Sequence, residues 1–406
     1  MIKQIRPNLF HLRVFQKVYE TRSITKTAEL LGRSQPAISQ ALKSLEKTFN
    51  TTLFHRSTKG ITKTKEAVTL LKRTNRALHS LDTFFDSVIS NFTHVPKNVS
   101  RHVTTTQLYA LQAVAEAGSF IAGAAIANKS SPTIHRAARD LEQTVNITLF
   151  ERTSFGIRPN KVAMQLAQVA GVIEREFELA FAEIAQNSNI EKGNTVIGAL
   201  PMARSYIIPK AIVEFKKECP HHNVSIVEGP YEYLLHDLMR GKIDILIGAS
   251  RRLHRGTALK QTPIITEPII LLMRTGHPLK TKDIVEIREL LLFPWITPRI
   301  SAPLREVYKE LFINNNLPLP ENVIESNSLS ASRVILQNSD TLMLLSKAQA
   351  KHELKTGSMI SKKIRGFDAQ RTIDLQIRQE SMLTKTQLNL IENIKQIAKS
   401  ESNILP

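Results

Sequence analysis

The sequence predicts a multi-domain protein with two helix-rich units followed by a two-lobed α/β domain. Three observations support this prediction. Residues 12–70 align with residues 108–166 without a gap, each copy has apolar residues at helical spacing, and short apolar strands alternate with helices from Thr195 onward. Because two copies are too few for a solenoid, we interpret the repeat as a duplicated domain.

The 406-residue chain has the composition of a soluble globular protein, with 42% hydrophobic and 22% charged residues. We expect no membrane partner, because no apolar stretch reaches about 18 residues and the N-terminus lacks a signal-peptide core. The single cysteine, Cys219, and the histidines lack the spacing of a disulfide framework or a metal site, so we expect no metal and no cofactor. These features favour a cytoplasmic protein.

The net charge of +19 is concentrated at one end of the chain. Residues 1–100 contain 17 basic and 6 acidic residues, residues 101–190 contain 8 of each, and residues 191–406 contain 30 and 22. A localised basic surface attracts the phosphate backbone of nucleic acids through counterion release. The distribution therefore predicts a nucleic-acid interface near the N-terminus.

The first copy predicts three short helices. Ser23 is a good N-cap for a helix over residues 25–31, Gly32 ends that helix, and Ser34 caps the next one with Pro36 in its first turn. The apolar faces are Leu12, Phe15 and Val18 in the first helix and Ile38, Leu42 and Leu45 in the third. Two short helices joined through a glycine turn form a helix-turn-helix arrangement.

A wing and a long helix complete the copy. Residues 53–56 are typical of a short strand and residues 57–60 of a turn, and Thr64 caps an amphipathic helix that follows. Both copies are therefore predicted to be all-α-dominated winged helix-turn-helix units.

The run SITKTAELLGRSQPAISQALKSLEKTFNTTLFHRSTKGITKT resembles the winged helix-turn-helix of LysR-type regulators, through its SQPA-I-S core, L-E pair and LF-x-R wing. The resemblance implies sequence-specific binding to double-stranded promoter or operator DNA. In that family the long helix pairs two subunits in antiparallel fashion, so a homodimer or homotetramer is implied. RNA polymerase is a further candidate partner, and the implied location is the cytoplasm, in association with the nucleoid.

The outward face of the third helix and the wing supply the predicted DNA contacts. Glutamine can read adenine, whereas serine, lysine and arginine can bind phosphates or guanine. The predicted residues are Ser34, Gln35, Pro36, Ser39, Gln40, Lys43, Arg56 and Lys59. For Ser34 and Pro36, helix capping is the favoured alternative.

The second copy departs from this pattern. Gln40 becomes Arg136, Lys43 becomes Arg139 and Lys59 becomes Phe155, and the segment has no net charge. We hypothesise that this copy is mainly a scaffold or dimerisation unit. Arg136, Arg139 and Arg152 keep an auxiliary DNA contact open.

We expect four segments along the chain. Residues 1–92 form the first unit, 93–105 a polar linker without apolar periodicity, 106–190 the second unit and 191–406 the α/β domain. In the α/β domain, strands are expected at 195–200, 223–227, 243–247, 264–265 and 268–274, and a similar pattern repeats from Trp295. Strands that alternate with helices imply a mostly parallel sheet.

The stretches VIGALP, RGKIDILIGA and GHPL are similar to the two-lobed, periplasmic-binding-protein-like effector domain of LysR regulators. Ligands of open α/β sheets bind beyond the carboxyl ends of strands. The predicted effector-binding residues are Pro201, Met202, Ala203, Arg204, Ser205, Gly248, Ala249, Ser250, Thr297, Pro298, Arg299, Ser326, Asn327 and Ser328. Hydroxyls and Arg204 would suit a small carboxylate or sugar acid.

The resulting prediction is a transcription regulator controlled by a small-molecule effector. An enzyme is not favoured, because no phosphate loop, metal triad or nucleophile elbow has the required spacing. Two alternatives remain: a nucleoid-type DNA-binding protein, or a solute-binding protein with a fused DNA-binding module. The first would not need an α/β domain of this size. An exported solute-binding transport component, a further rival for the α/β half, would have no use for a basic helix-turn-helix.

Overall fold

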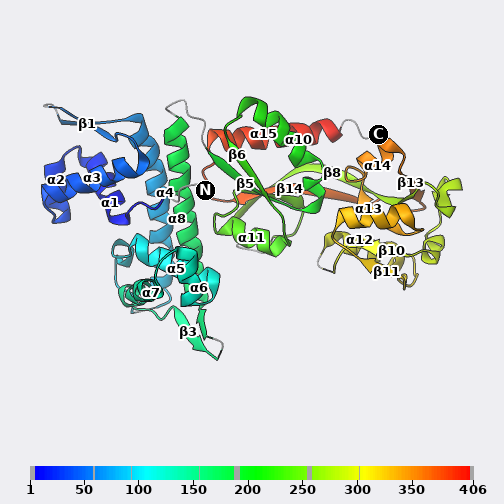
Figure 1. Cartoon of the computed structure of the whole chain (residues 1–406), viewed down its shortest axis with the longest axis horizontal. Coiled ribbons are helices and arrows are strands. Elements are labelled where there is room, and N and C mark those ends of the chain that lie inside the picture. The colour runs from blue at the N-terminus through cyan, green and yellow to red at the C-terminus, as the bar shows by residue number, and fades with distance from the viewer. Residues whose placement is uncertain are drawn as a thin grey trace. The chain divides into compact units, whose positions relative to one another are not determined.

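The computed structural model describes residues 5–57, 60–92, 94–154, 156–186, 193–253, 258–300 and 302–402. These residues form two compact units (Figure 1). The helical unit consists mainly of the residues before Val196, and the α/β unit consists mainly of the residues from Val196 onward.

The helical unit contains two copies of one order of elements. The first copy comprises α1 (Leu9–Thr21), α2 (Ile24–Leu31), α3 (Gln35–Phe49), β1 (Phe54–Ser57), β2 (Gly60–Lys63) and α4 (Lys65–Ile89). The second copy comprises α5 (Thr105–Ala117), α6 (Phe120–Ala127), α7 (Ser131–Val145), β3 (Phe150–Thr153), β4 (Gly156–Pro159) and α8 (Lys161–Gln186). The duplicated winged helix-turn-helix predicted from the internal repeat is confirmed.

Local capping positions the third helix in both copies. The Ser34 side chain accepts a hydrogen bond from the backbone N–H of Ala37, and Ser130 does the same for Thr133. Gly32 ends α2 in the left-handed region, with φ of 59°. The predicted caps Ser23 and Thr64 are also confirmed. These caps satisfy backbone groups that would otherwise lack partners at the helix ends.

The segment between the copies is packed against them, so the expectation that it lacks apolar periodicity needs correction. It contains the short 3-10 helix η1 (Val99–Arg101), and Val95, Val99 and Val103 are all buried. The three valines recur every four residues and belong to the same hydrophobic core as both copies. Their spacing was a helical signal within a segment of otherwise polar composition.

The α/β unit begins with the elements of its first lobe. In chain order these are β5 (Asn194–Ala199), α9 (Pro201–Arg204), α10 (Ile207–Glu218), β6 (Asn223–Val227), α11 (Tyr231–Met239), β7 (Ile245–Ala249) and β8 (Leu259–Arg274). The second lobe follows with η2 (Pro278–Thr281), β9 (Ile284–Val285), η3 (Ile287–Leu292), β10 (Trp295–Thr297), α12 (Pro303–Ile313), β11 (Val323–Glu325), α13 (Leu329–Asn338), β12 (Leu342–Ser346), α14 (Lys351–Thr356) and β13 (Met359–Ile364). The chain then returns through β14 (Gln370–Arg378) and ends in α15 (Lys385–Ser402).

The sheet of this unit has the order β11-β10-β12-β8-β14-β7-β5-β6, and β13 pairs with both β8 and β9. β5 and β7 are parallel, as are β10, β11 and β12, whereas β8 and β14 run antiparallel to their neighbours. The sheet is therefore mixed, and the expectation of a mostly parallel sheet needs correction. The two strands predicted at 264–265 and 268–274 are parts of the continuous β8.

Each lobe has its own hydrophobic core. Ile197, Ile247 and Ile373 belong to the core of the first lobe. In the second, the Trp295 ring packs against Tyr308 and Phe312, with ring centroids 5.2 and 5.6 Å apart. β8 pairs with β14 in one lobe and with β12 and β13 in the other, so one strand crosses between the lobes.

Among the described residues, no single helix has the length and apolarity needed to cross a membrane. α5 and α6 meet that criterion only as a pair, and the chain bends by 118° between them.

Candidate nucleic-acid interface and effector site

The third helix of the first copy has one buried and one exposed face. Ile38, Ala41, Leu42, Leu45 and Phe49 are buried. On the opposite face, Gln35, Gln40 and Lys43 are exposed, and Ser39 is half-buried. The side chains of Gln35, Gln40 and Lys43 form no hydrogen bond or ion pair with other residues that the structure describes. They are therefore free to bind a partner.

The wing of the first copy is anchored to α1 through a contact between aromatic rings. Phe54 of β1 packs on Phe15 of α1, with ring centroids 5.6 Å apart. The Lys63 ammonium lies 3.6 Å from the centre of the Tyr19 ring, which orients this cation toward the protein. Two predicted contacts on the wing have no described position: Lys59 lies outside the described residues, and so does the side chain of Arg56.

The corresponding helix of the second copy is α7. One of the arginines of α7 predicted as auxiliary DNA contacts forms an ion pair within the same helix. The Arg139 guanidinium contacts the Glu142 carboxylate at 2.5 Å. Glu142 also accepts hydrogen bonds from the backbone N–H groups of Leu149 and Phe150, at 2.7 and 3.0 Å. In the first copy Lys43 occupies the position of Arg139 and remains unpaired among the described residues. The two copies therefore present different chemistry at equivalent positions.

Two further arginines of the second copy remain exposed. Arg136 lies on the outward face of α7 and Arg152 lies on β3. The neighbouring His135 packs its ring against Phe120, with centroids 4.7 Å apart. An auxiliary contact with DNA is thus sterically open to Arg136 and Arg152.

In the first lobe, the predicted effector residues follow β5 and β7. Pro201, Met202, Ala203 and Arg204 form the short helix α9, and the Ser205 hydroxyl donates a hydrogen bond to the Pro201 carbonyl at 2.9 Å. Ala203 is buried in the core of the lobe. The positive side chain predicted to receive a carboxylate, Arg204, contacts the Glu228 carboxylate at 2.5 Å. A protein carboxylate therefore already neutralises this cation.

The loop after β7 leads to β8 and is hydrogen-bonded to β14. The backbone N–H of Ser250 donates to the Thr372 carbonyl at 2.7 Å, and Gln261 donates to the Ser250 hydroxyl at 3.3 Å. A Cβ atom at Gly248 would lie only 2.3 Å from a methyl group of Leu200, so this position requires the absence of a side chain. Ala249 is half-buried beside them. Packing against Leu200 explains why position 248 is a glycine, whereas Ser250 contributes a polar hydroxyl to this loop.

In the second lobe, the predicted residues come together at the ends of β10 and β11. The backbone N–H of Arg299 donates to the Asn327 side-chain carbonyl at 3.1 Å, and that of Ser326 donates to the Thr297 carbonyl at 2.9 Å. Ser328 caps α13 by accepting from Ala331. Thr297 and Pro298 lie next to a cation that the sequence analysis did not identify.

That cation is Arg305, in the first turn of α12. Its guanidinium donates hydrogen bonds to the Thr297 hydroxyl and, at 3.1 Å, to the Pro298 carbonyl. Its Nε is buried and has no hydrogen-bond partner among the described residues. A positive charge at the start of the helix that follows Thr297 was the signal available in the sequence.

A cluster of cations that the sequence analysis also did not identify lies around the end of β7. The Arg251 guanidinium lies 4.2 Å from the centre of the Tyr231 ring, and its Nε is buried without a hydrogen-bond partner in the described part of the chain. Burial lowers the pKa of Arg371 in β14, and the positive charge of Arg251 lowers it further. Two cations that destabilise each other in this way would be stabilised by an anion.

Among the described residues, no three His, Cys, Asp or Glu side chains are grouped so that they could hold a metal ion.

Comparisons with known proteins agree with this architecture. Residues 9–68 and 105–164 each match the family of bacterial regulatory helix-turn-helix proteins of the lysR type, and residues 189–399 match the LysR substrate binding domain. The HTH-type transcriptional regulator GalR of Pseudomonas putida is 27% identical over 402 residues, which is 99% of this chain and 100% of that protein. The regulator PcaQ of Agrobacterium fabrum is 24% identical over 300 residues, covering 74% of this chain and 96% of that protein.

A solved structure shows a similar fold. A full-length single-substitution variant of OxyR from Pseudomonas aeruginosa has a TM-score of 0.54 and 20% sequence identity, and the match covers 73% of this chain and 98% of that one. The two helix-turn-helix matches and the substrate-binding match together extend over most of the chain. The chain belongs to the LysR family of DNA-binding transcriptional regulators and contains the helix-turn-helix unit of that family twice.

Proposed function

We propose that α3 of the first copy reads the target promoter in the major groove. One observation carries this proposal: Gln35, Gln40 and Lys43 are exposed on α3, opposite a fully buried apolar face. Glutamine amides can pair with adenine, and the Lys43 ammonium can bind a phosphate or guanine. Ser39 lies on the same helix, and Arg56 and Lys59 of the wing would contact the adjacent backbone. Ser34 and Pro36 act as the helix start and not as readers.

Alanine at Gln35, Gln40, Lys43 and Arg56 together tests this assignment. The expected result is loss of occupancy at the target promoter, while the circular dichroism spectrum and the thermal unfolding of the protein remain unchanged. Lys395 of α15 is exposed in the α/β unit, so Lys395→Ala is a control for the loss of a surface lysine. Undiminished occupancy in the folded quadruple variant would overturn the proposal.

We also propose that the effector is an anionic small molecule, such as a carboxylate or a sugar acid, bound at the strand ends of the α/β unit. Arg204 is paired closely with Glu228, whereas Arg305 lies at a longer distance of 3.7 Å from Glu325 and its buried Nε has no hydrogen-bond partner among the described residues. The anion would therefore be received by Arg305 beside Thr297 or by the Arg251 and Arg371 pair. The hydroxyls of Ser250 and Ser326 would supply hydrogen bonds. Charged hydrogen bonds of this kind are the strong contacts in such sites.

A thermal-shift screen of small carboxylates and sugar acids tests the effector proposal. We expect one class of compound to stabilise the native chain and to lose its effect in Arg305→Ala or Arg251→Ala. The same compound should still stabilise Arg204→Ala, the matched control. Stabilisation lost only in the Arg204 variant would restore the assignment made from the sequence.

Effector binding would be transmitted to DNA through movement of the two lobes about β8 and β14. Closure of the lobes would alter how chains associate and hence the bend or spacing of the bound DNA. We expect chains to associate as homodimers or homotetramers, to contact RNA polymerase and to act in the cytoplasm on the nucleoid, without catalytic activity. Unchanged DNA footprints and bend angles in the presence of a bound effector would contradict this mechanism.

A further inference from the structure

The long helices of the two copies pack along each other within one chain. α4 and α8 run in opposite directions, because α4 begins beside the first wing and α8 begins beside the second, at the other end of the pair (Figure 1). Buried residues of both helices, among them Leu78, Leu81, Ile173 and Phe177, belong to one continuous hydrophobic core. The arrangement that the family resemblance implied between two subunits therefore exists inside a single chain.

A buried ionic cluster holds this helix pair together. The Arg73 side chain of α4 is completely buried and donates two hydrogen bonds of 2.9 Å to Glu183 and one of 2.8 Å to Glu176, both in α8. Arg76 adds a contact of 3.2 Å to Glu176. A guanidinium that meets a carboxylate through two parallel hydrogen bonds requires one defined register of the two helices.

The residues of the cluster are not repeated at the equivalent positions of the other copy. A shift of 96 residues, which superimposes the two copies in sequence, places Val169 at the position of Arg73 in α8. The same shift places Ser80 and Ser87 of α4 at the positions of Glu176 and Glu183. The arginine is therefore present only in α4, and the two glutamates are present only in α8. The cluster forms only in an unlike pair, that is, when an α4 helix packs against an α8 helix.

Pairing of like helices would leave buried charges without partners. In an antiparallel α4–α4 pair of two chains, each Arg73 would face Ser80 and Ser87, which carry no charge. In an α8–α8 pair, Glu176 and Glu183 would face Val169. Removal of one partner from a buried ion pair is strongly destabilising, because the remaining charge is desolvated without compensation. The cluster thus acts against assembly through identical copies.

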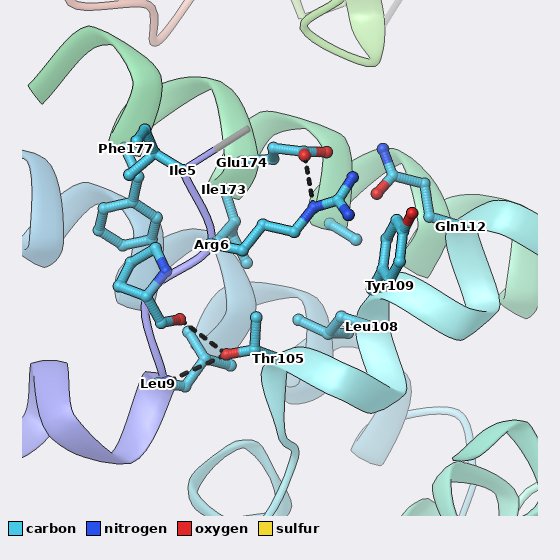
Figure 2. A pocket seen from close by; sticks show the side chains of 12 residues that line it. Ile5, Arg6, Leu9, Thr105, Leu108, Tyr109, Gln112, Ile173, Glu174 and Phe177 are labelled. Atoms are coloured by element: carbon cyan, nitrogen blue, oxygen red, sulfur yellow. Dashed lines mark hydrogen bonds and ion pairs between the residues drawn. The ribbon is translucent and has the colours of Figure 1, made fainter. Parts of the chain in front are cut away.

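A second contact between the copies is equally specific for the unlike pair. The Arg6 side chain, ahead of α1, donates a hydrogen bond of 2.7 Å to Glu174 of α8, and its guanidinium lies 3.4 Å from the centre of the Tyr109 ring (Figure 2). The Thr105 hydroxyl bridges the Pro7 carbonyl and the backbone N–H of Leu9, at 2.8 and 3.1 Å (Figure 2).

The repeat does not preserve this contact either. The positions that correspond to Tyr109 and Glu174 in the first copy are Arg13 and Leu78. An identical first copy in place of the second would therefore set Arg6 against an arginine and a leucine. Like charges in contact are unfavourable, so this contact also favours the unlike pair.

We propose that the second copy is the built-in partner of the first, so that one chain completes its own paired DNA-binding unit. Arg73, Glu176 and Glu183 select this pairing within the chain and exclude pairing between identical copies of two chains. Association between chains then takes place outside the α4 and α8 pair.

Zero-length cross-linking can test the pairing in the full-length protein. Arg73→Lys retains the positive charge and places an amine beside Glu176 and Glu183, so a carbodiimide should join the introduced amine to one of these glutamates by an amide bond. We expect mass spectrometry to find this cross-link in material that migrates as a single chain of 45.7 kDa under denaturing conditions.

A two-chain version decides between pairing within and between chains. One chain carries Arg73→Lys, Glu176→Gln and Glu183→Gln, the other keeps the native residues, and the two are co-expressed with different tags and purified through both. We expect no cross-link from the introduced amine of the first chain to a glutamate of the second. A cross-link at a yield similar to that of the single variant Arg73→Lys would overturn the proposal.

A charge-reversed chain provides an independent variant with the same readout. In Arg73→Glu, Glu176→Gln, Glu183→Lys, the amine and the carboxylate exchange helices, and we again expect the cross-link within one chain. Formation of this cross-link only in a species of twice the mass would contradict pairing within the chain.

Discussion

Arg73 of α4 and Glu183 of α8 face each other through two parallel hydrogen bonds of 2.9 Å, although 110 residues separate them in the chain. The geometry explains how a regulator with two diverged helix-turn-helix copies keeps them in one defined arrangement. It also divides the roles of the copies. The first has an outward helix face with unpaired polar side chains, and the second provides the carboxylates that hold the first in place.

The first prediction concerns the stability of the helical unit. Arg73→Met leaves the buried Glu176 carboxylate without its main partner, and loss of one member of such a cluster costs about 3–5 kcal/mol. We expect thermal unfolding of the helical unit to shift to lower temperature by a corresponding amount. Lys17→Ala, which breaks an exposed pair with Glu20, should cost less than about 1 kcal/mol.

A triple variant separates electrostatic loss from lost packing. Arg73→Met with Glu176→Leu and Glu183→Leu removes every charge of the cluster, and a buried cluster replaced by apolar groups is often neutral or more stable. We expect the triple variant to recover most of the stability lost in Arg73→Met. A triple variant as unstable as the single one would show that the charges are not the cause.

The second prediction concerns the outward face of α3. Lys43→Ala should weaken DNA binding for all sequences and reduce the slope of log affinity against log salt concentration by about 1. Gln40→Ala should instead cost about 1–3 kcal/mol at one base-pair position and relax the preference there. Binding titrations at several salt concentrations, on the native site and on single-base variants, distinguish the two effects. Equal behaviour of the two variants would contradict separate roles for these side chains.

The third prediction concerns the arginine of α7 that replaces Lys43. Arg139 pairs with Glu142, which also accepts two backbone hydrogen bonds at the start of the second wing. Because Arg139 is partly exposed, its loss should cost about 1 kcal/mol of stability or less. We expect Arg139→Ala to change DNA affinity less than Lys43→Ala does, in parallel binding and unfolding measurements. A larger loss of affinity in Arg139→Ala would assign α7 a direct role in DNA recognition.

The fourth prediction concerns the pH dependence of the α/β unit. The buried His277 ring accepts a hydrogen bond from the backbone N–H of Leu279 at Nδ1, while Nε2 lies 3.2 Å from the Asp340 carbonyl oxygen. Burial lowers the pKa of His277 from its ordinary value of 6.5; the Asp340 carbonyl and carboxylate oppose the shift, and Arg274 adds to it. The folded protein therefore stabilises the neutral ring.

The sign of the effect follows from proton linkage. The unfolded state binds a proton at His277 more readily than the folded state, so the stabilisation is present above the unfolded pKa and is lost as pH falls through the folded pKa. We expect the melting temperature to fall below about pH 6.5. His277→Asn can still cap the same turn. The melting temperature of this variant should fall less steeply as the pH is lowered over the same range. Parallel slopes for the two proteins would remove His277 as the cause.

Much of the fold could be predicted from short-range patterns. Ser34, Gly32 and Thr64 specify helix ends through hydrogen bonds and backbone conformations that involve neighbouring residues only. At the positions 96 residues later, Ser130, Asn128 and Asn160 cap the corresponding helices of the second copy. The duplication itself was visible from identical residues at this shift, such as Ser34 and Ser130. The outward face of α3 followed from its apolar period in the same way.

Strand pairing was predicted less well. Two separate strands were expected at 264–265 and 268–274, whereas the segment forms the continuous β8, which contains Pro263 and Pro268. In the sheet, Pro263 lies opposite Asp374, where the register of β14 shifts, and Pro268 lies where β8 changes its partner from β14 to β12. A proline is tolerated at such irregular positions because its missing N–H is not needed there. The prolines are visible in the sequence, but the sequence does not show which strand pairs with them.

Local patterns in the sequence were sufficient to predict two winged helix-turn-helix copies and a two-lobed α/β domain, because caps, apolar periods and charge distribution depend on nearby residues. The packed structure was needed to show that Arg73 is buried, that Arg204 is neutralised and that Arg305 lies beside Thr297. Whether a charged side chain faces solvent or a partner depends on residues distant in the chain, such as Glu176, 103 positions beyond Arg73. Such contacts leave no periodic trace in the sequence, and they form only when the helices and strands have packed.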